Sequence, residues 1–381
     1  MNFEKNILES TDTFEQLLNT YSNMAKAIRL DVGQPDLTTD KFVQEKAIEK
    51  IKSGIVGYEA GMKDLKCSII NQFFPDCQVS EENILISHGA IGSLFSTLFS
   101  LINNGDEVLI PDPTWPTISR LVNFLGGQPI YYPFLNKNDI SELEVNLTNR
   151  ISSKTSILIL VNPNNPNGLL INNARLLSNI GRIAEKHNLI VVNDGTYQEL
   201  LYRNIVTIPN LLSIPTLKKR CVMIGSFSKT FNMTGWRLGY SVSDKSIINR
   251  ISNVSALATG GSNTISQYAA IEAIKHFNNI RNQNINIYQE RLDVCKKLLN
   301  GNGIEFINPD SAFYIFVNCN CDDQKMATIL AKKGVTVVPG YLFGENGRGY
   351  IRIALTQPLK MLEKAIRIVV ECIIKGDDKN A

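Results

Sequence analysis

The chain has 381 residues, of which 44% are apolar and 20% are charged, and its formal net charge is +3. This length suits a large domain with a smaller one, and no basic run indicates a nucleic acid or a membrane surface as partner. No apolar stretch approaches the roughly 20 residues of a transmembrane helix, and the N-terminus lacks the apolar segment of a secretory signal, so we expect a cytoplasmic protein.

Short apolar runs alternate with helical patterns up to about residue 250. This alternation predicts an α/β domain with a mostly parallel sheet flanked by helices. An amphipathic stretch at 174–187 predicts a helix on one face of that sheet. The expected strands are 84–87, 108–110, 129–132, 156–161, 189–192 and 222–225.

After residue 250 the pattern changes to a long helical region at 267–299, three strands at 312–317, 334–338 and 350–354, and a final helix at 359–374. These elements predict a smaller α+β domain. In the final helix the apolar positions fall on one face: Leu362, Ala365, Ile366, Val369, Val370 and Ile373. We therefore predict an N-terminal segment (1–40) that packs with the small domain, a large cofactor-binding domain (41–250) and a small C-terminal domain (251–381).

Polar side chains follow five of the predicted strands, at the point where each strand ends. In an open α/β sheet, ligands bind beyond the carboxyl ends of the strands, so these clusters should converge on one site. The clusters are His88-Gly89-Ala90, Asp112-Pro113-Thr114-Trp115, Asn162-Pro163-Asn164-Asn165-Pro166, Asp194, and Ser226-Phe227-Ser228-Lys229.

The run GSFSKTFNMTGWRLGY, residues 225–240, carries the most specific signal. It places Lys229 after a strand, beside Ser226 and Ser228, with Arg237 eight positions further on. A lysine attacks carbonyls when burial or neighbouring cations lower its pKa. Hydroxyls and a guanidinium are the donors that a phosphate group needs. Each residue alone could be an ordinary loop residue, but together they indicate a site.

This segment resembles the lysine motif of the class I/II aminotransferases, the fold-type-I pyridoxal-phosphate enzymes related to aspartate aminotransferase. The resemblance covers nearly the whole chain, with the motifs in the same order. It implies a large domain with a mostly parallel, seven-stranded type of sheet and a smaller α+β domain. It also implies that Lys229 holds pyridoxal 5'-phosphate as a Schiff base, and that Ser226, Ser228 and Arg237 hold its phosphate.

The same resemblance gives roles to residues that would contact the cofactor ring. Asp194, in NDGTYQEL, is expected to pair with the ring nitrogen and keep it protonated, which makes the ring a better electron sink. Asn165, in NPNNPNG, and Tyr197 are expected near the phenolic oxygen. Trp115, in DPTWPT, occupies the place of the aromatic residue that stacks on the ring.

Other matches concern the phosphate, the substrate and a second subunit. Gly89 and Ala90 would present backbone N–H groups to the phosphate at a helix N-terminus, whereas the role of the preceding His88 stays open. Substrate binding is expected at Arg352, which would grip the α-carboxylate, together with Gly33 and Asn165. Tyr58, in GYEAGMKDLK, resembles the tyrosine that reaches the phosphate of the neighbouring subunit, which implies a homodimer with shared active sites.

The resulting hypothesis is an aminotransferase that moves an amino group from an L-amino acid to a 2-oxo acid. The sequence departs from the family pattern at Ser311, Tyr341 and the loop 258–262. Because of these departures, a pyridoxal-phosphate-dependent lyase or cyclase stays as the alternative. A non-catalytic relative is disfavoured, because the lysine, the aspartate and both arginines of the site are present together.

Seven cysteines are scattered along the chain, at positions 67, 77, 221, 295, 319, 321 and 372. Cys319 and Cys321 form a C-x-C pair, but no second pair or nearby histidine completes a zinc site. We therefore expect no metal site.

Overall fold

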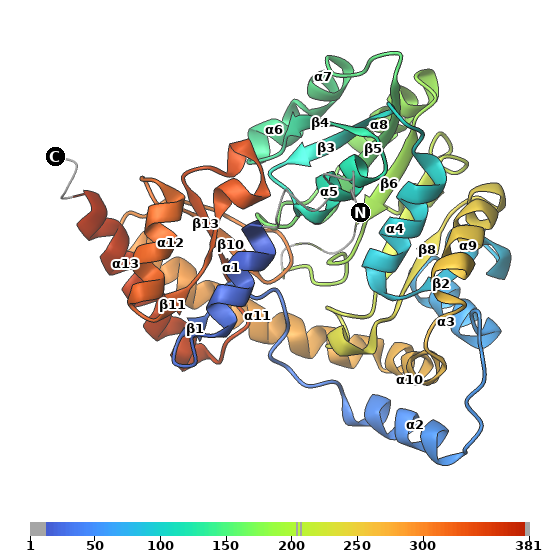
Figure 1. Cartoon of the computed structure of the whole chain (residues 1–381), viewed down its shortest axis with the longest axis horizontal. Coiled ribbons are helices and arrows are strands. Elements are labelled where there is room, and N and C mark those ends of the chain that lie inside the picture. Colours follow the sequence, from blue (N-terminus) through green and yellow to red (C-terminus); the bar gives the residue numbers. More distant parts are fainter. Residues whose placement is uncertain (1–12, 203–204, 206–207, 378–381) are drawn as a thin grey trace, which may run out of the picture.

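The computed structural model describes residues 13–202, 205 and 208–377. The large domain is built on a seven-stranded sheet in the order β2-β8-β7-β6-β5-β3-β4 (Figure 1). Strands β3 to β7 are parallel, and β8 runs antiparallel to its neighbours β2 and β7. The strands are β2 (Ile84–Ser87), β3 (Glu107–Asp112), β4 (Gln128–Pro133), β5 (Thr155–Val161), β6 (Ile190–Asp194), β7 (Cys221–Ser226) and β8 (Gly239–Val242).

Helices cover both faces of this sheet. Successive side chains of a strand point to opposite faces, so in the central strands both sets of side chains are buried and the strands are apolar throughout. In β5, Ile157 and Ile159 belong to one buried cluster, whereas Leu158 and Leu160 belong to the other. The first cluster packs against α4 (Gly89–Leu101), α5 (Thr117–Phe124) and α9 (Lys245–Thr259). The second packs against α2 (Lys41–Lys52), α3 (Lys63–Phe73), α7 (Leu143–Thr148), α8 (Ala174–Lys186) and α10 (Thr264–Lys275), and the short α6 (Lys137–Ser141) precedes α7.

The small domain contains an antiparallel sheet in the order β12-β13-β10-β9 and a separate parallel pair, β1 with β11. Its final helix buries all six residues of the predicted apolar face. The strands are β1 (Ile28–Arg29), β9 (Phe306–Ile307), β10 (Tyr314–Asn318), β11 (Val335–Thr336), β12 (Val338–Pro339) and β13 (Tyr350–Ala354). The helices are α1 (Thr13–Ser22), α11 (Phe277–Asn300), α12 (Asp323–Lys332) and α13 (Leu359–Asp377).

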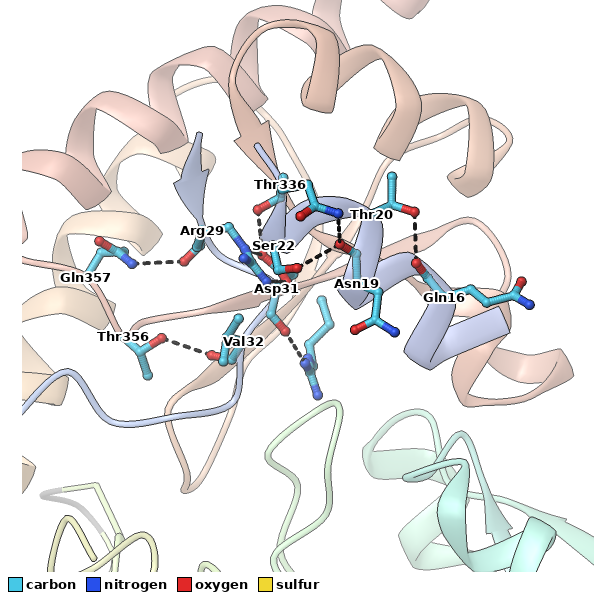
Figure 2. Close-up of polar contacts among 12 residues, drawn as sticks. Gln16, Asn19, Thr20, Ser22, Arg29, Asp31, Val32, Thr336, Thr356 and Gln357 are labelled. Atoms are coloured by element: carbon cyan, nitrogen blue, oxygen red, sulfur yellow. Dashed lines mark hydrogen bonds and ion pairs between the residues drawn. The ribbon is translucent and has the colours of Figure 1, made fainter. Parts of the chain in front are cut away.

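The N-terminal segment is held on the small domain by β1 and by the residues that follow it. Figure 2 shows Arg29 and Thr336 directed at Asp31, whose side chain is fully buried. Arg29 donates to both carboxylate oxygens of Asp31 at 2.7 Å, and Gln357 donates to the backbone oxygen of Arg29 at 3.1 Å. These contacts fix the chain just before Gly33, the first residue predicted to bind substrate.

Several elements differ from the sequence prediction, among them the short strands β1 and β9, which were not expected. Strand β8 was not predicted, because Gly239 and Ser241 interrupt its apolar pattern. The long helix expected at 267–299 is divided at His276, where φ is −100° and ψ is 13°. The strand expected at 334–338 is divided too, since the backbone on the two sides of Val337 pairs with different sheets.

The α/β fold class is confirmed, whereas the domain boundaries stay a prediction, and residues 1–12 of the N-terminal segment lie outside the described residues. Ala269 and Ala273 of α10, which fall within the predicted small domain, pack in the core cluster of the large sheet. No helix in the described part of the chain is long and apolar enough to cross a membrane. The cytoplasmic location likewise stays a prediction.

Candidate active site

A cavity of about 340 Å³ lies where the carboxyl ends of the large sheet meet the small domain. The convergence expected from the polar strand ends is therefore present in the structure. Eleven of the predicted site residues line this cavity: Gly33, Ala90, Trp115, Asn165, Asp194, Tyr197, Ser226, Ser228, Lys229, Arg237 and Arg352.

Lys229 follows β7, and its Nζ atom donates a hydrogen bond to the backbone oxygen of Gly33 at 2.6 Å. Burial, followed by the positive charges of Arg352 and Arg237, lowers the pKa of this amine to about 8, against the opposing effect of Asp194. A larger share of the amine is therefore neutral near pH 7 than in an ordinary lysine, and the neutral amine is the nucleophile.

Asp194 is the last residue of β6, and its buried side chain is held from one side only. The backbone N–H and the hydroxyl of Thr196 both donate to Oδ1, at 3.0 Å and 2.5 Å. Oδ2 accepts no hydrogen bond from the described residues. Burial raises the pKa of this carboxyl, whereas Thr196 and Lys229 oppose the rise. A cationic N–H group placed at Oδ2 would hold the carboxylate in its charged form.

A group of hydrogen-bond donors surrounds the N-terminus of α4 at the other end of the cavity. Gly89 begins the helix with φ of +71°, and a Cβ atom there would stand 2.7 Å from Nη2 of Arg237. Ser226 Oγ accepts from the backbone N–H of Ser228 at 3.1 Å, which leaves its own proton free to donate. Backbone amides, hydroxyls and a guanidinium around a helix N-terminus are suited to a phosphate.

Arg352, in β13, is only 2% exposed and forms no ion pair with a described residue. Its Nη1 donates to Oδ1 of Asn165 at 2.9 Å, and its Nη2 donates to the backbone oxygen of Asp31 at 2.7 Å. Its Nε is buried without a partner among the described residues. The rings of Tyr314 and Phe343 lie 4.4 Å and 4.9 Å from the guanidinium. A buried cation in the wall of a cavity, with no ion pair to a described residue, is suited to a carboxylate ligand.

Asn165 and Tyr197 present the remaining polar groups. The amide oxygen of Asn165 is used by Arg352, so its Nδ2, which has no partner among the described residues, is available as a donor. The hydroxyl of Tyr197 lies 2.9 Å from that of Tyr314, and both residues are buried. Because each phenol carries one proton, Tyr197 can donate to a ligand while Tyr314 donates to Tyr197.

Sequence reasoning missed Tyr314 and Thr196 as members of the site. Tyr314 supports Arg352 and Tyr197, and a Cβ atom at Gly33 would lie 2.1 Å from its hydroxyl, so position 33 requires a glycine. The available signal was the run Ala312-Phe313-Tyr314, in which the tyrosine adds a hydroxyl group to an otherwise apolar strand.

Other predicted features lie away from the cavity. Tyr58 is fully exposed, and His88 lines a neighbouring crevice instead. Ser311 is buried and donates to the backbone oxygens of Tyr197 at 3.1 Å and Leu200 at 2.7 Å, so its hydroxyl braces the turn after β6. Within the described residues, no three histidine, cysteine or acidic side chains gather as metal ligands would.

Comparison with known proteins identifies the class to which this fold and site belong. The model of the family "Aminotransferase class I and II" matches residues 25–369. The aspartate aminotransferase of Pyrococcus horikoshii is 30% identical over 377 residues, covering 96% of this chain and 95% of that protein. The aspartate aminotransferase of Geobacillus stearothermophilus is 30% identical over 353 residues, covering 89% of each chain.

Solved structures agree with this relationship. The aspartate aminotransferase of Thermotoga maritima has a TM-score of 0.89 at 27% identity, over 96% of this chain and 98% of that one. The aromatic aminotransferase of P. horikoshii has a TM-score of 0.87 at 28% identity, over 96% and 100% of the two chains. The chain belongs to the aminotransferase class I and II family, and it is an aminotransferase.

Proposed function

We propose that this aminotransferase binds pyridoxal 5'-phosphate in the 340 Å³ cavity, covalently attached to Lys229, and exchanges amino groups between L-amino acids and 2-oxo acids. The observation that carries the proposal is the pairing, in one cavity, of a lysine with a lowered pKa and a buried arginine without an ion pair among the described residues. The lysine is suited to attack the aldehyde of the cofactor, and the arginine is suited to bind the α-carboxylate that every amino acid carries.

The residues present fit this cofactor. The donors at the N-terminus of α4, together with Ser226, Ser228 and Arg237, would hold its phosphate. The unused Oδ2 of Asp194 would pair with a protonated ring nitrogen, and Asn165 and Tyr197 would donate to its phenolic oxygen. No metal enters this proposal.

Bound there, the cofactor supplies an electron sink for negative charge at the substrate Cα. Arg352, in the wall of the cavity, would bind the α-carboxylate and so orient the Cα–H bond. Once the substrate amine has replaced it, the neutral amine of Lys229 would take the Cα proton and deliver it to the carbon of the former cofactor aldehyde. Asp194 keeps positive charge on the ring nitrogen throughout.

A homodimer is part of the proposal. Tyr58 is 100% exposed, and neighbouring large apolar side chains are exposed as well: Ile51, Ile55, Val56 and Leu257. The loop that carries Tyr58 is fixed beside the start of α10, because the Thr264 hydroxyl donates to the backbone oxygen of Gly57 at 2.7 Å. This exposed apolar surface suits contact with a second copy of the chain. The Tyr58 of that copy would reach the phosphate cradle, the group of donors formed by the N-terminus of α4 with Ser226, Ser228 and Arg237.

The alternative of a lyase or cyclase rested on Ser311, Tyr341 and the loop 258–262. None of these lines the cavity in the described part of the chain, so the lining of the cavity does not support the alternative. The family and its relatives favour amino-group transfer.

A single-turnover experiment tests the proposal. The cofactor-loaded enzyme is mixed with a panel of L-amino acids while its visible spectrum and the products are followed. Transfer predicts stoichiometric pyridoxamine phosphate and a 2-oxo acid. Release of ammonia, or of a cyclised product, with return of the starting spectrum would instead establish the lyase or cyclase. Lys229→Ala is the control and should show neither change.

A further inference from the structure

Three positively charged side chains line the cavity among the described residues: Lys229, Arg237 and Arg352. The proposed function, on which this inference rests, uses all three, for the cofactor aldehyde, its phosphate and the substrate α-carboxylate. No further lysine, arginine or histidine of the described chain reaches the cavity. A second carboxylate on the substrate would therefore find no cation in this wall.

The part of the wall that remains for the substrate side chain is apolar. It is formed by Phe14 and Leu18 of α1, by Val32 beside the Gly33 turn and by Ile91 of α4. Apolar walls remove water from a side chain and provide nothing to replace the hydrogen bonds of a charged group.

This wall is continuous with the carboxylate site. The guanidinium of Arg352 lies 4.9 Å from the ring centre of Phe343, and Phe343 meets Phe14 edge to face at 5.9 Å. Phe14 and Leu17 of α1 also pack against the small-domain cluster that contains Phe316. Figure 1 shows α1 beside β10 and β13, which agrees with these contacts. A substrate anchored at Arg352 therefore has α1 among its immediate neighbours.

We propose that this cavity selects amino acids with large apolar side chains, aromatic or aliphatic, over those with acidic side chains. This preference differs from the substrate in the names of the two relatives described above, which are aspartate aminotransferases. The side-chain carboxylate of an acidic substrate would lie unpaired against the apolar wall. We expect this to lower the second-order rate constant, relative to an apolar substrate, by a factor of at least about 100, or roughly 2.7 kcal/mol.

The direct test measures that rate constant for the first half-reaction with L-phenylalanine, L-leucine and L-aspartate, using the loaded wild-type enzyme. We expect phenylalanine or leucine to exceed aspartate by about 100-fold or more. Aspartate reacting as fast as both would overturn the proposal, because a cation must then reach the side chain from outside the observed wall.

A binding measurement separates this proposal from the proposed reaction. The inhibitors 3-phenylpropanoate and succinate each carry one carboxylate that can bind Arg352. At the other end, which would contact the apolar wall, the first has a phenyl ring and the second has another carboxylate. Tighter binding of 3-phenylpropanoate, seen in the cofactor spectrum, supports the selectivity even if no amino acid is turned over. Tighter binding of succinate contradicts the selectivity, whatever the reaction proves to be.

A matched pair of variants tests the role of α1. Leu18→Arg adds a cation to the wall, whereas Gln16→Arg adds the same charge at an exposed position of the same helix, labelled in Figure 2. We expect Leu18→Arg to raise the aspartate-to-phenylalanine rate ratio at least about tenfold, and Gln16→Arg to leave it within about twofold. An equal effect of both variants would refute a specific role for Leu18.

Discussion

Capture of pyridoxal phosphate by the cofactor-free protein should level off at a lower pH than capture by an ordinary lysine. Only the neutral amine of Lys229 attacks the aldehyde, and its pKa is lowered to about 8. At that pKa about a tenth of the amine is neutral at pH 7, half at pH 8 and nine tenths at pH 9. The capture rate should therefore rise about fivefold from pH 7 to 8 and less than about twofold from pH 8 to 9.

A variant identifies the cause of the lowered pKa. Burial is its largest cause and the positive charge of Arg352 the second, so Arg352→Gln should move the midpoint of the profile to higher pH. Arg348→Gln is the matched control, since Arg348 is an exposed arginine of the same domain that pairs with Glu345. That variant should leave the midpoint unchanged.

Stopped-flow absorbance at the visible band of the bound cofactor gives the rate at each pH. A rate that keeps rising tenfold per pH unit up to pH 10 would show an ordinary lysine and would refute the reasoning from burial. Equal shifts in the two variants would show that general charge, rather than the proximity of Arg352, sets the pKa.

Four further substitutions test individual contacts of the site. Arg352→Lys, which loses the planar guanidinium, should raise the half-saturating amino-acid concentration about 10-fold or more in steady-state kinetics. Asp194→Asn should lower kcat by about 10²–10³-fold while the phosphate cradle still binds cofactor, as equilibrium dialysis would show. Tyr314→Phe and Tyr197→Phe should each lower the free energy of unfolding by about 1 kcal/mol, and their double variant should lose less than the sum. Additive losses in urea unfolding would contradict the hydroxyl pair.

The sequence predicted those parts of the site that lie at the ends of strands. Asp194, Lys229 and Asn165 each follow or end an apolar run, so local pattern was enough to place them in one crevice. Parallel strands bring such ends together whatever the details of packing.

The parts that were missed depend on contacts between distant segments. Tyr314 reaches Tyr197 across 117 positions of sequence, from a strand of the small domain to a turn of the large one. Phe14 and Leu18 enter the wall only because α1 docks against the small domain. Strand β8 is defined by its hydrogen bonds to β2 and β7 rather than by its own composition. No local pattern carries such information.

The most direct test of the account is to locate the cofactor. Purified enzyme loaded with pyridoxal phosphate is reduced with borohydride, digested and mapped by mass spectrometry. We expect one modified peptide, with the pyridoxyl group on Lys229. Modification of a different lysine, or a yellow protein from which reduction fixes no cofactor at position 229, would contradict it.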